Sequence, residues 1–346
     1  MTLVIHMGTG KTGTTYLQDI VFPELCKKKG IEFNPPIFSK LFWLLGPESY
    51  EEYKNNLNYL EDNKFLEYKK DLETYIKNKK IFLSLESFCS LGYQLDVTFS
   101  KKLLAYFIPS FKAVIVLRKH SDFLYSLYRQ TILQGNIVEY DKFLSYKKVN
   151  YSYAFNQRFN FKNPKINISE LSYKKIIEDI EDLKNCKGVF IYNYDDFNLS
   201  NRAFINSLFT IVLKTKLDKN DCSLVARLLR IPRKNVSIDI DVIDLILKLN
   251  RITPFDKFML YSSDTYLNKK RINSFLAIFY KNIPSFILRI FTWRTIRKIL
   301  KSSFLKKIIP SSKLKFKIYN HINNFSELYK RDQIYVSKKF VNIKDY

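Results

Sequence analysis

The sequence predicts an α/β fold in which a central, mostly parallel sheet is flanked by helices. Three features indicate this class: short runs that are apolar throughout, longer segments of helical periodicity between them, and a loop rich in glycine and threonine directly after the first run. Continuous apolar runs are typical of strands covered on both faces. With 346 residues, 46% of them hydrophobic, the chain can bury a substantial core.

Four of these runs are predicted to be buried strands, and a fifth segment, GIEFNPP at 30–36, predicts a short extra strand ended by prolines. The four are TLVIH at 2–6, KIFLSLE at 80–86, KAVIVLR at 112–118 and GVFIYNY at 188–194. A helix is predicted within 51–78, because its charged residues alternate with Tyr and Leu at steps of three and four.

The loop HMGTGKTGTTYLQ, residues 6–18, follows the first strand and leads into a helix. Backbone N–H groups and the positive end of a helix dipole favour an anion at such a junction. Lys11 adds a positive charge, and the threonines add hydroxyl donors. The loop therefore predicts a site for a phosphate or phosphosulfate group, the alternative being an ordinary Gly/Thr turn before a helix.

The spacing of this loop differs from that of the Walker loop. A Walker loop needs a glycine five residues before the glycine that precedes the lysine, and that position is Ile5, inside the strand. A kinase or ATPase would also need a carboxylate at a strand end to hold magnesium. The third strand ends instead in Arg118, which suggests that positive side chains neutralise the nucleotide without a metal ion.

Two motifs together resemble a known family. The loop resembles the phosphosulfate-binding loop of sulfotransferases that use 3′-phosphoadenosine 5′-phosphosulfate (PAPS), especially bacterial glycan-type members. VIVLRKHSDFLYSLYRQ, residues 114–130, resembles their 3′-phosphate motif, an arginine at a strand end followed eight residues later by a serine on a helix. Weaker similarity runs through LSLESF, VFIYNYDDF and RKNVS. The resemblance covers about residues 1–251 and implies a P-loop-NTPase-like sulfotransferase fold.

The resemblance also implies a reaction, the in-line transfer of a sulfuryl group from PAPS to a hydroxyl or amine of an acceptor. Lys11 would lie beside the oxygen that bridges phosphate and sulfate and stabilise the charge that develops there. Arg118 and Ser126 would hold the 3′-phosphate, although Arg118 could instead form a structural ion pair. The residues that would hold the 5′-phosphate with Lys11 are Gly10, Thr12, Gly13, Thr14 and Thr15.

Glu86 is the candidate for the group that takes the proton from the acceptor. It follows the second strand at its carboxyl end, where open α/β sheets gather ligands, and glycan sulfotransferases resemble this chain in using a glutamate there. The alternative is a solvent-facing or arginine-paired carboxylate. His120 competes for this role, although we expect it on the 3′-phosphate side. His6 lies in a buried strand and is expected to be a core histidine.

The chain departs from the family pattern at two points. Gly10 stands where related bacterial loops often carry a bulkier residue. The late RKGxxG motif of the small-molecule sulfotransferases is absent, and Arg233, in the segment IPRKNVS, is the nearest basic substitute. Arg233 is therefore predicted to contact the donor.

The pattern changes beyond Arg251, where no further buried-strand run appears and the chain is helical and basic. We expect a catalytic nucleotide-binding domain over 1–251 and a helical C-terminal extension over 252–346. The segment 284–310 places Trp293 and other apolar residues on one helical stripe, with basic residues largely opposite. Such a helix suits an anionic membrane surface, and it could instead cover the core.

The formal net charge of +25 indicates a polyanionic partner, although a genome-wide compositional bias could produce part of it. We expect a glycan or glycolipid acceptor rather than nucleic acid, because no nucleic-acid recognition module is present. No export signal or membrane-spanning segment is predicted, which favours a cytoplasmic location, with peripheral contact at the inner membrane face. The cysteines are scattered and are expected to be reduced, with no metal bound: Cys26, Cys89, Cys186 and Cys222.

Two other classes of function stay open on the sequence alone. One is a P-loop-type kinase with a degenerate phosphate loop, which would depend on magnesium and bind ATP. The other is a binding or regulatory protein built on the same nucleotide fold. The presence of Lys11, Arg118 and Ser126 together favours the enzyme, because a scaffold protein has no need of two phosphate sites.

Overall fold

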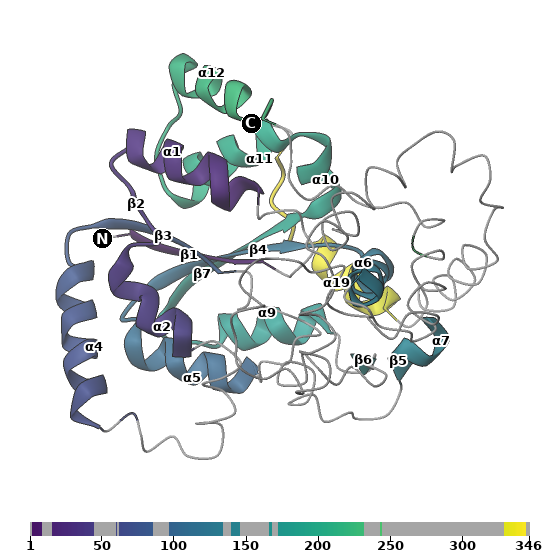
Figure 1. Ribbon diagram of the computed structural model, residues 1–346, viewed down its shortest axis with the longest axis horizontal. Helices are drawn as coiled ribbons and strands as arrows, with labels where there is room; N and C mark the ends of the chain where they lie inside the picture. Colours follow the sequence, from purple (N-terminus) through teal and green to yellow (C-terminus); the bar gives the residue numbers. More distant parts are fainter. Residues whose placement is uncertain are drawn as a thin grey trace, which may run out of the picture.

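The computed structural model describes residues 2–8, 16–44, 60, 62–85, 97–133, 140–145, 166–167, 172–231, 243 and 329–343. These residues are built around a five-stranded sheet in the order β2-β3-β1-β4-β7. Every neighbouring pair in this sheet is parallel. The predicted α/β class with a parallel sheet is therefore confirmed, as Figure 1 shows.

Each of the five predicted strands is present, with ends that shift by one or two residues in most cases. The strands are β1 (Thr2–Gly8), β2 (Glu32–Phe33), β3 (Lys80–Leu85), β4 (Phe111–Leu117) and β7 (Cys186–Asn193). Both faces of the sheet are covered. Leu3, Ile5 and Met7 of β1 join one buried core, whereas Val4 joins the other. Burial on both faces explains why these runs are apolar at successive positions.

The helices form a layer on each face of the sheet (Figure 1). The face that includes Val4 is covered by η1 (Leu17–Val21), α1 (Phe22–Lys28), α11 (Asn201–Ser207), η6 (Leu208–Val212) and α12 (Lys219–Leu228). The opposite face is covered by η2 (Pro36–Phe38), α2 (Ser39–Leu44), α4 (Asn63–Ile76), α5 (Val97–Phe107) and α9 (Tyr173–Glu181).

The helix predicted within 51–78 is observed as α4. It begins after Asp62, whose carboxylate accepts a 3.0 Å hydrogen bond from the backbone N–H of Lys64, an N-cap that satisfies one of the free donors of the first turn. Its buried side chains recur at three- and four-residue steps, as an amphipathic helix requires: Phe65, Tyr68, Leu72 and Ile76.

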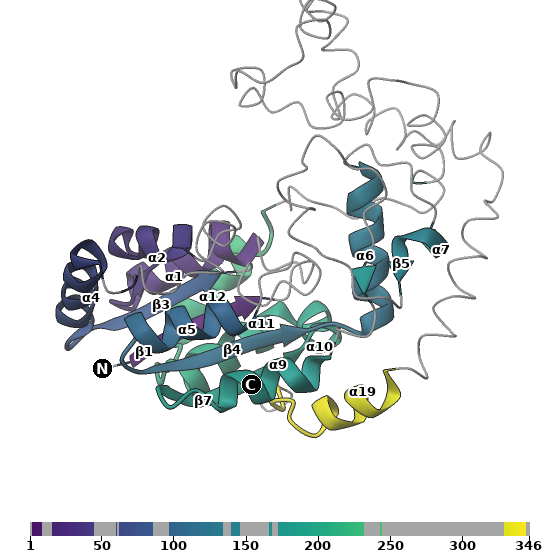
Figure 2. The same ribbon diagram turned by 90° about the horizontal axis from the view of Figure 1, so that it is seen from below.

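The remaining described elements lie beyond the carboxyl ends of the strands or beside β7 (Figure 2). They are α6 (His120–Leu133), α7 (Tyr140–Phe143), α10 (Tyr194–Leu199), the short parallel pair β5 (Leu144–Ser145) and β6 (Ile166–Asn167), and α19 (Lys330–Ser337). Among the described residues, no helix has the length and apolar character needed to cross a bilayer.

The described part of the predicted C-terminal extension packs on the α/β unit. The helix α19 lies against α9, and Phe340 forms a parallel bridge with Ile191 of β7. The backbone N–H of Val341 donates a 2.8 Å hydrogen bond to the carbonyl of Ile191. Residues 252–328, including the basic segment 284–310, lie outside the described residues, and the boundary at 251 stays a prediction.

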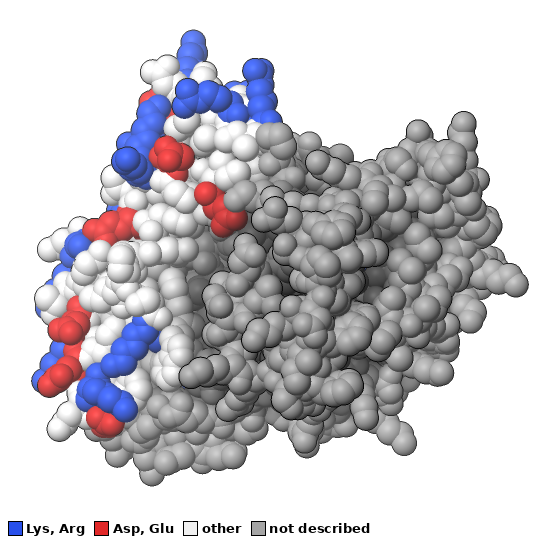
Figure 3. Space-filling view, viewed as in Figure 1, with Lys and Arg blue, Asp and Glu red and all other residues white. Residues whose placement is uncertain are grey.

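Basic and acidic side chains occur side by side over the described part of the face in Figure 3. Two of the ion pairs among the described residues join lysines of α1 and the turn after it to Asp221 of α12. Lys28 and Lys29 are therefore neutralised locally by this carboxylate.

Candidate functional site

The strand order places a change of direction between the neighbouring strands β1 and β4. The connection from β1 runs to β2 on one side of the sheet, whereas the connection from β4 runs to β7 on the other side. Neighbouring strands whose connections leave in opposite directions form a topological switch point, and open α/β sheets bind ligands there. The strand order of this chain therefore identifies the ends of β1 and β4 as the candidate binding site.

The register brings the predicted motifs to neighbouring strand ends. Gly8, the last residue of β1, pairs with Val116, two residues before Arg118. On the other side of β1, Met7 pairs with Leu85, directly before Glu86. Three adjacent strand ends thus lead into the phosphate loop, Glu86 and Arg118.

Several predicted site residues lie outside the described residues. These are Gly10, Lys11, Thr12, Gly13, Thr14, Thr15, Glu86 and Arg233. The structure shows the strand ends that precede residues 10–15 and Glu86 in the sequence. The side-chain roles of all eight residues stay predictions. Arg118 and Ser126 are described.

Arg118 follows β4 and is held from two directions. Its guanidinium carbon lies 4.7 Å from the ring centre of Tyr194, the first residue of α10, at the distance of a cation–π contact. Its backbone carbonyl accepts a 2.7 Å hydrogen bond from the hydroxyl of Tyr173. Burial raises the pKa of Tyr173 far above its usual range, so this hydroxyl remains a donor at every physiological pH.

Ser126 lies on α6, eight residues after Arg118. Both side chains are partly exposed, whereas the neighbouring Leu124, Leu127 and Tyr128 are buried in the core. Arg118 and Ser126 thus belong to one strand–helix unit, and their role at a 3′-phosphate stays a prediction. The sequence did not indicate the roles of Tyr173 and Tyr194; the only signal for Tyr194 is its place as the last residue of the strand predicted over 188–194.

His120, the alternative to Glu86 as the base, is buried beside the C-terminal segment. Its side chain is 1% exposed, and its Nε2 lies 3.0 Å from a carboxylate oxygen of Asp332. The imidazole is stacked between two tyrosine rings, with ring centres 3.9 Å away for Tyr173 and 4.0 Å for Tyr329. This environment gives His120 a structural partner on the C-terminal segment.

A polar cluster occupies the β1–β3 boundary. His6 Nδ1 lies 2.7 Å from the hydroxyl of Ser84, and Gln18 donates to the same hydroxyl at 2.7 Å. The side-chain carbonyl of Asn34 accepts a 2.8 Å hydrogen bond from the backbone N–H of Ser84. His6 and Gln18 are the two ends of the loop 6–18, and both contact Ser84. Ser84 precedes Glu86 by two residues. The cluster therefore joins both ends of this loop to the strand that leads to Glu86.

His6 itself is a core histidine, as expected. It is 0% exposed and packs near the rings of Phe22 and Phe82. Burial lowers the pKa of His6 to about 4, because the charged imidazolium loses its hydration. His6 is therefore neutral at physiological pH.

The described residues contain no group of three His, Cys, Asp or Glu side chains that could bind a metal ion. Cys26, Cys186 and Cys222 are free thiols, and burial raises the pKa values of Cys26 and Cys186. Cys26 is buried and chemically protected in its thiol form. Cys89 lies outside the described residues.

Neither a protein-family model nor a curated protein matches this chain. Solved structures do match it. A sulfotransferase from Alicyclobacillus acidocaldarius is 13% identical with a TM-score of 0.41, over 72% of this chain and 92% of that chain. Mouse sulfotransferase SULT7A1 complexed with PAP is 13% identical with a TM-score of 0.31, over 84% of this chain and 86% of that chain.

A third match is retinol dehydratase in complex with androsterone and the inactive cofactor PAP, which is 16% identical with a TM-score of 0.29, over 66% of this chain and 64% of that chain. The chain is thus similar to these proteins at low sequence identity. The function proposed below depends on the chain's own motifs and strand order.

Proposed function

We propose that this chain is a sulfotransferase that moves a sulfuryl group from PAPS to an acceptor. The observation that carries the proposal is the switch point, at which the loop with Lys11 and the turn with Arg118 follow paired strands. PAPS carries a phosphosulfate at its 5′ end and a phosphate at its 3′ position. A nucleoside triphosphate carries phosphates at the 5′ end alone, so two phosphate sites on one edge fit PAPS better.

The motif residues have complementary roles in this proposal. Backbone N–H groups of the loop 10–15 and the threonine hydroxyls hold the 5′-phosphate. Arg118 pairs with the 3′-phosphate through its planar fork of donors, and Ser126 adds a hydroxyl. The partial exposure of Arg118 and Ser126 supports this, because both side chains can reach a ligand.

Glu86 and Lys11 carry the chemical step. Glu86 accepts the proton of the acceptor hydroxyl while the hydroxyl oxygen forms a bond to sulfur. Lys11 stabilises the negative charge left on the 5′-phosphate as the bond between sulfur and the bridging oxygen breaks. The products are the sulfated acceptor and 3′,5′-adenosine bisphosphate (PAP). No metal ion takes part in this scheme.

We infer a carbohydrate or glycolipid acceptor. Glu86, the residue that follows β3 in the sequence, supports this, since glycan-type members of the resembled family use a glutamate there. The basic segment 284–310 would bring the enzyme to an anionic membrane that holds such an acceptor. The corresponding location is cytoplasmic, at the inner face of the membrane.

Radiolabelled PAPS and calorimetry test the proposal together. We expect transfer of ³⁵S to a carbohydrate or glycolipid acceptor, and we expect PAP to bind more tightly than ATP without added Mg²⁺. Lys11→Ala and Glu86→Gln should each lose at least about 100-fold in turnover while PAP affinity changes far less. Lys77→Ala, which removes a charge at the opposite edge of the sheet, is the matched control. Binding of ATP in preference to PAP, dependent on Mg²⁺, would favour the kinase instead.

A further inference from the structure

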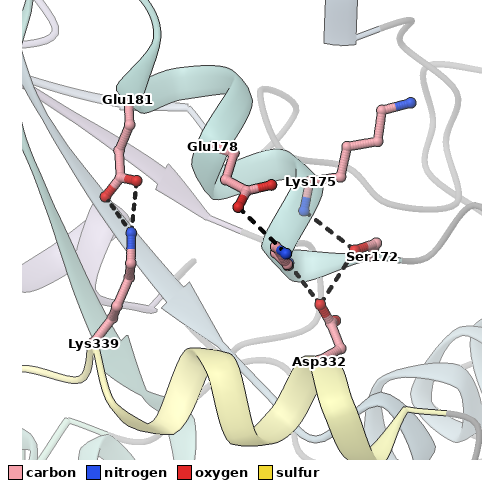
Figure 4. Close-up of polar contacts among 7 residues, drawn as sticks. Ser172, Lys175, Glu178, Glu181, Asp332 and Lys339 are labelled. Carbon is pink, nitrogen blue, oxygen red and sulfur yellow. Dashed lines mark hydrogen bonds and ion pairs between the residues drawn. The ribbon is translucent and has the colours of Figure 1, made fainter.

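The C-terminal segment 329–343 packs beside the turn that carries Arg118. The helix α19 lies along α9, as Figure 2 and Figure 4 show. Lys339 forms an ion pair with Glu181 at 2.6 Å, toward the carboxyl end of α9. Tyr329 and Val336 of this segment are buried in the same core as the sheet.

Asp332 is the polar centre of this contact. Its carboxylate accepts hydrogen bonds from the backbone N–H groups of Tyr173 at 2.8 Å and Lys174 at 2.7 Å. It also accepts one from the hydroxyl of Ser172 at 3.2 Å, which Figure 4 shows. A carboxylate at the first turn of a helix satisfies free N–H groups and interacts favourably with the helix dipole. Asp332 thereby fixes the start of α9.

The same carboxylate reaches His120, which begins α6. Asp332 Oδ2 lies 3.0 Å from His120 Nε2, and the imidazole ring is held between Tyr173 and Tyr329. The carboxylate side chain of Asp332 is 11% exposed. Burial opposes the ionisation of Asp332, but its hydrogen bonds from His120, Lys174 and Tyr173 outweigh burial and lower its pKa.

Two of the residues that Asp332 contacts, His120 and Tyr173, connect it to Arg118. His120 is two residues further along the chain, and the backbone N–H of Phe123 closes the first turn of α6 on the carbonyl of Lys119 at 2.9 Å. Tyr173, whose N–H binds Asp332, donates its hydroxyl to the carbonyl of Arg118. The turn 118–120 is therefore held at both ends through groups that Asp332 orients.

We propose that Asp332 is a positioning residue for the donor site, which holds the turn 118–120 so that Arg118 meets the 3′-phosphate. This inference rests on the proposed function and extends it to the C-terminal segment, which shares no motif with the donor site. A displacement of about 1 Å in a binding group is enough to lose much of its contribution. The segment 329–343 thus contributes to nucleotide recognition without contacting the nucleotide.

The ratio of PAP to AMP affinity separates this role from a general effect on stability, because AMP lacks the 3′-phosphate. We expect Asp332→Asn to weaken PAP binding by about tenfold or more and to leave AMP binding unchanged. Asp332→Asn keeps an oxygen acceptor for the N–H groups of α9, whereas Asp332→Ala would remove it. We therefore choose Asp332→Asn as the variant that keeps the fold. Circular dichroism and the unfolding midpoint establish that the variant is folded at the assay temperature.

Lys339→Ala is the matched control, since it removes a different polar contact of the same segment with α9. We expect it to leave both affinities unchanged. Equal losses of PAP and AMP affinity in Asp332→Asn, or unchanged PAP affinity in the folded variant, would overturn the positioning role. A wild-type chain that binds PAP no better than AMP would instead overturn the proposed function, so the two failures are distinguishable.

Discussion

The side chains of His6 and Ser84 are joined across β1 and β3 by a 2.7 Å hydrogen bond at directly paired positions. His6 lies two residues before the end of β1, and Ser84 lies one residue before the end of β3. Either the neutral imidazole or the hydroxyl can be the hydrogen-bond donor in this contact, depending on the tautomer of His6. The pair connects the strand that leads into the phosphate loop with the strand that leads into Glu86.

Because His6 is neutral in the folded chain, stability should depend on pH. The folded-state pKa of His6 is lowered to about 4, while the unfolded value is about 6.5. The unfolded chain therefore binds more protons between these values, and the stability due to this group is complete above about pH 6.5 and lost as pH falls toward 4. Between pH 7.5 and 5, the loss should be about 2 kcal/mol.

Urea unfolding of the wild-type chain and of His6→Asn at the two pH values measures this effect. Asn offers Ser84 a polar group near the position of Nδ1 but does not titrate. The difference between the two proteins isolates His6 from the other histidines and the carboxylates. A pH dependence of unfolding that is the same in both would show that His6 is not the titrating group.

Ser84→Ala should lower the free energy of unfolding by about 1–3 kcal/mol, because it leaves His6 and Gln18 without the hydroxyl that they share. Ser223→Ala is a suitable control. Its hydroxyl is exposed and bonds only locally, to the carbonyl of Lys219 at 2.9 Å, so we expect a change within about 0.5 kcal/mol. Equal effects of the two substitutions in denaturant titrations would contradict the role given to Ser84.

Substitution of Asp221 should also lower the free energy of unfolding strongly. Its carboxylate is 0% exposed, forms a capping box with Asp218 at the start of α12, and pairs with Lys28 at 2.8 Å and with Lys29. Burial alone would raise its pKa, but the lysines and the cap lower it strongly. Asp221→Ala loses both the cap and the ion pairs and should cost about 3 kcal/mol of stability.

The exposed Asp71 of α4 provides the comparison for Asp221. Asp71→Ala should change the unfolding free energy by about 0.5 kcal/mol or less. Thermal unfolding at neutral pH compares both variants with the wild-type chain. If Asp221→Ala unfolds at the same temperature as Asp71→Ala, the cap and ion pairs of Asp221 do not stabilise the fold as predicted.

The proposed membrane contact predicts that binding to anionic vesicles depends on the basic segment and on the salt concentration. Replacing five of the basic residues of the segment 284–310 by glutamine should abolish binding to vesicles with anionic lipid, since each contributes about 1 kcal/mol near such a surface. Those residues are Arg294, Arg297, Lys298, Lys301 and Lys306. Wild-type binding should weaken between low and high salt.

The control variant carries five glutamines at exposed lysines of the α/β unit: Lys27, Lys70, Lys77, Lys102 and Lys184. Its net charge equals that of the tail variant. Vesicle sedimentation at low salt compares the three proteins. Equal loss of binding in both variants would indicate a response to total charge and would rule out a specific role for the tail.

The sheet could be predicted from the sequence because its strands are buried on both faces. Runs such as those around Ile115 and Ile191 are apolar at nearly every position, and local composition alone therefore marks them. The packing of residues 329–343 against α9 and the start of α6 could not be predicted. This contact depends on Asp332, His120 and Tyr173, which lie far apart in the chain and follow no periodic pattern.

The candidate site was predictable to a similar extent. Arg118 and Ser126 belong to a contiguous motif, so their shared strand–helix unit follows from their spacing. The groups that orient Arg118 come from α9 and α10 instead. Such contacts across the fold leave no trace in local sequence, because packing alone brings Tyr173 and Tyr194 to the end of β4.

The most direct test of the donor site is calorimetric titration of the wild-type chain and Arg118→Ala with PAP and with AMP. The wild-type chain should bind PAP more tightly than AMP. Arg118→Ala should lose about 1.5 to 3 kcal/mol of PAP affinity, the usual contribution of a hydrogen bond to a charged group, and keep its AMP affinity. Lys77→Ala should change neither. A PAP-to-AMP affinity ratio that is the same in Arg118→Ala and in the wild-type chain would contradict the account.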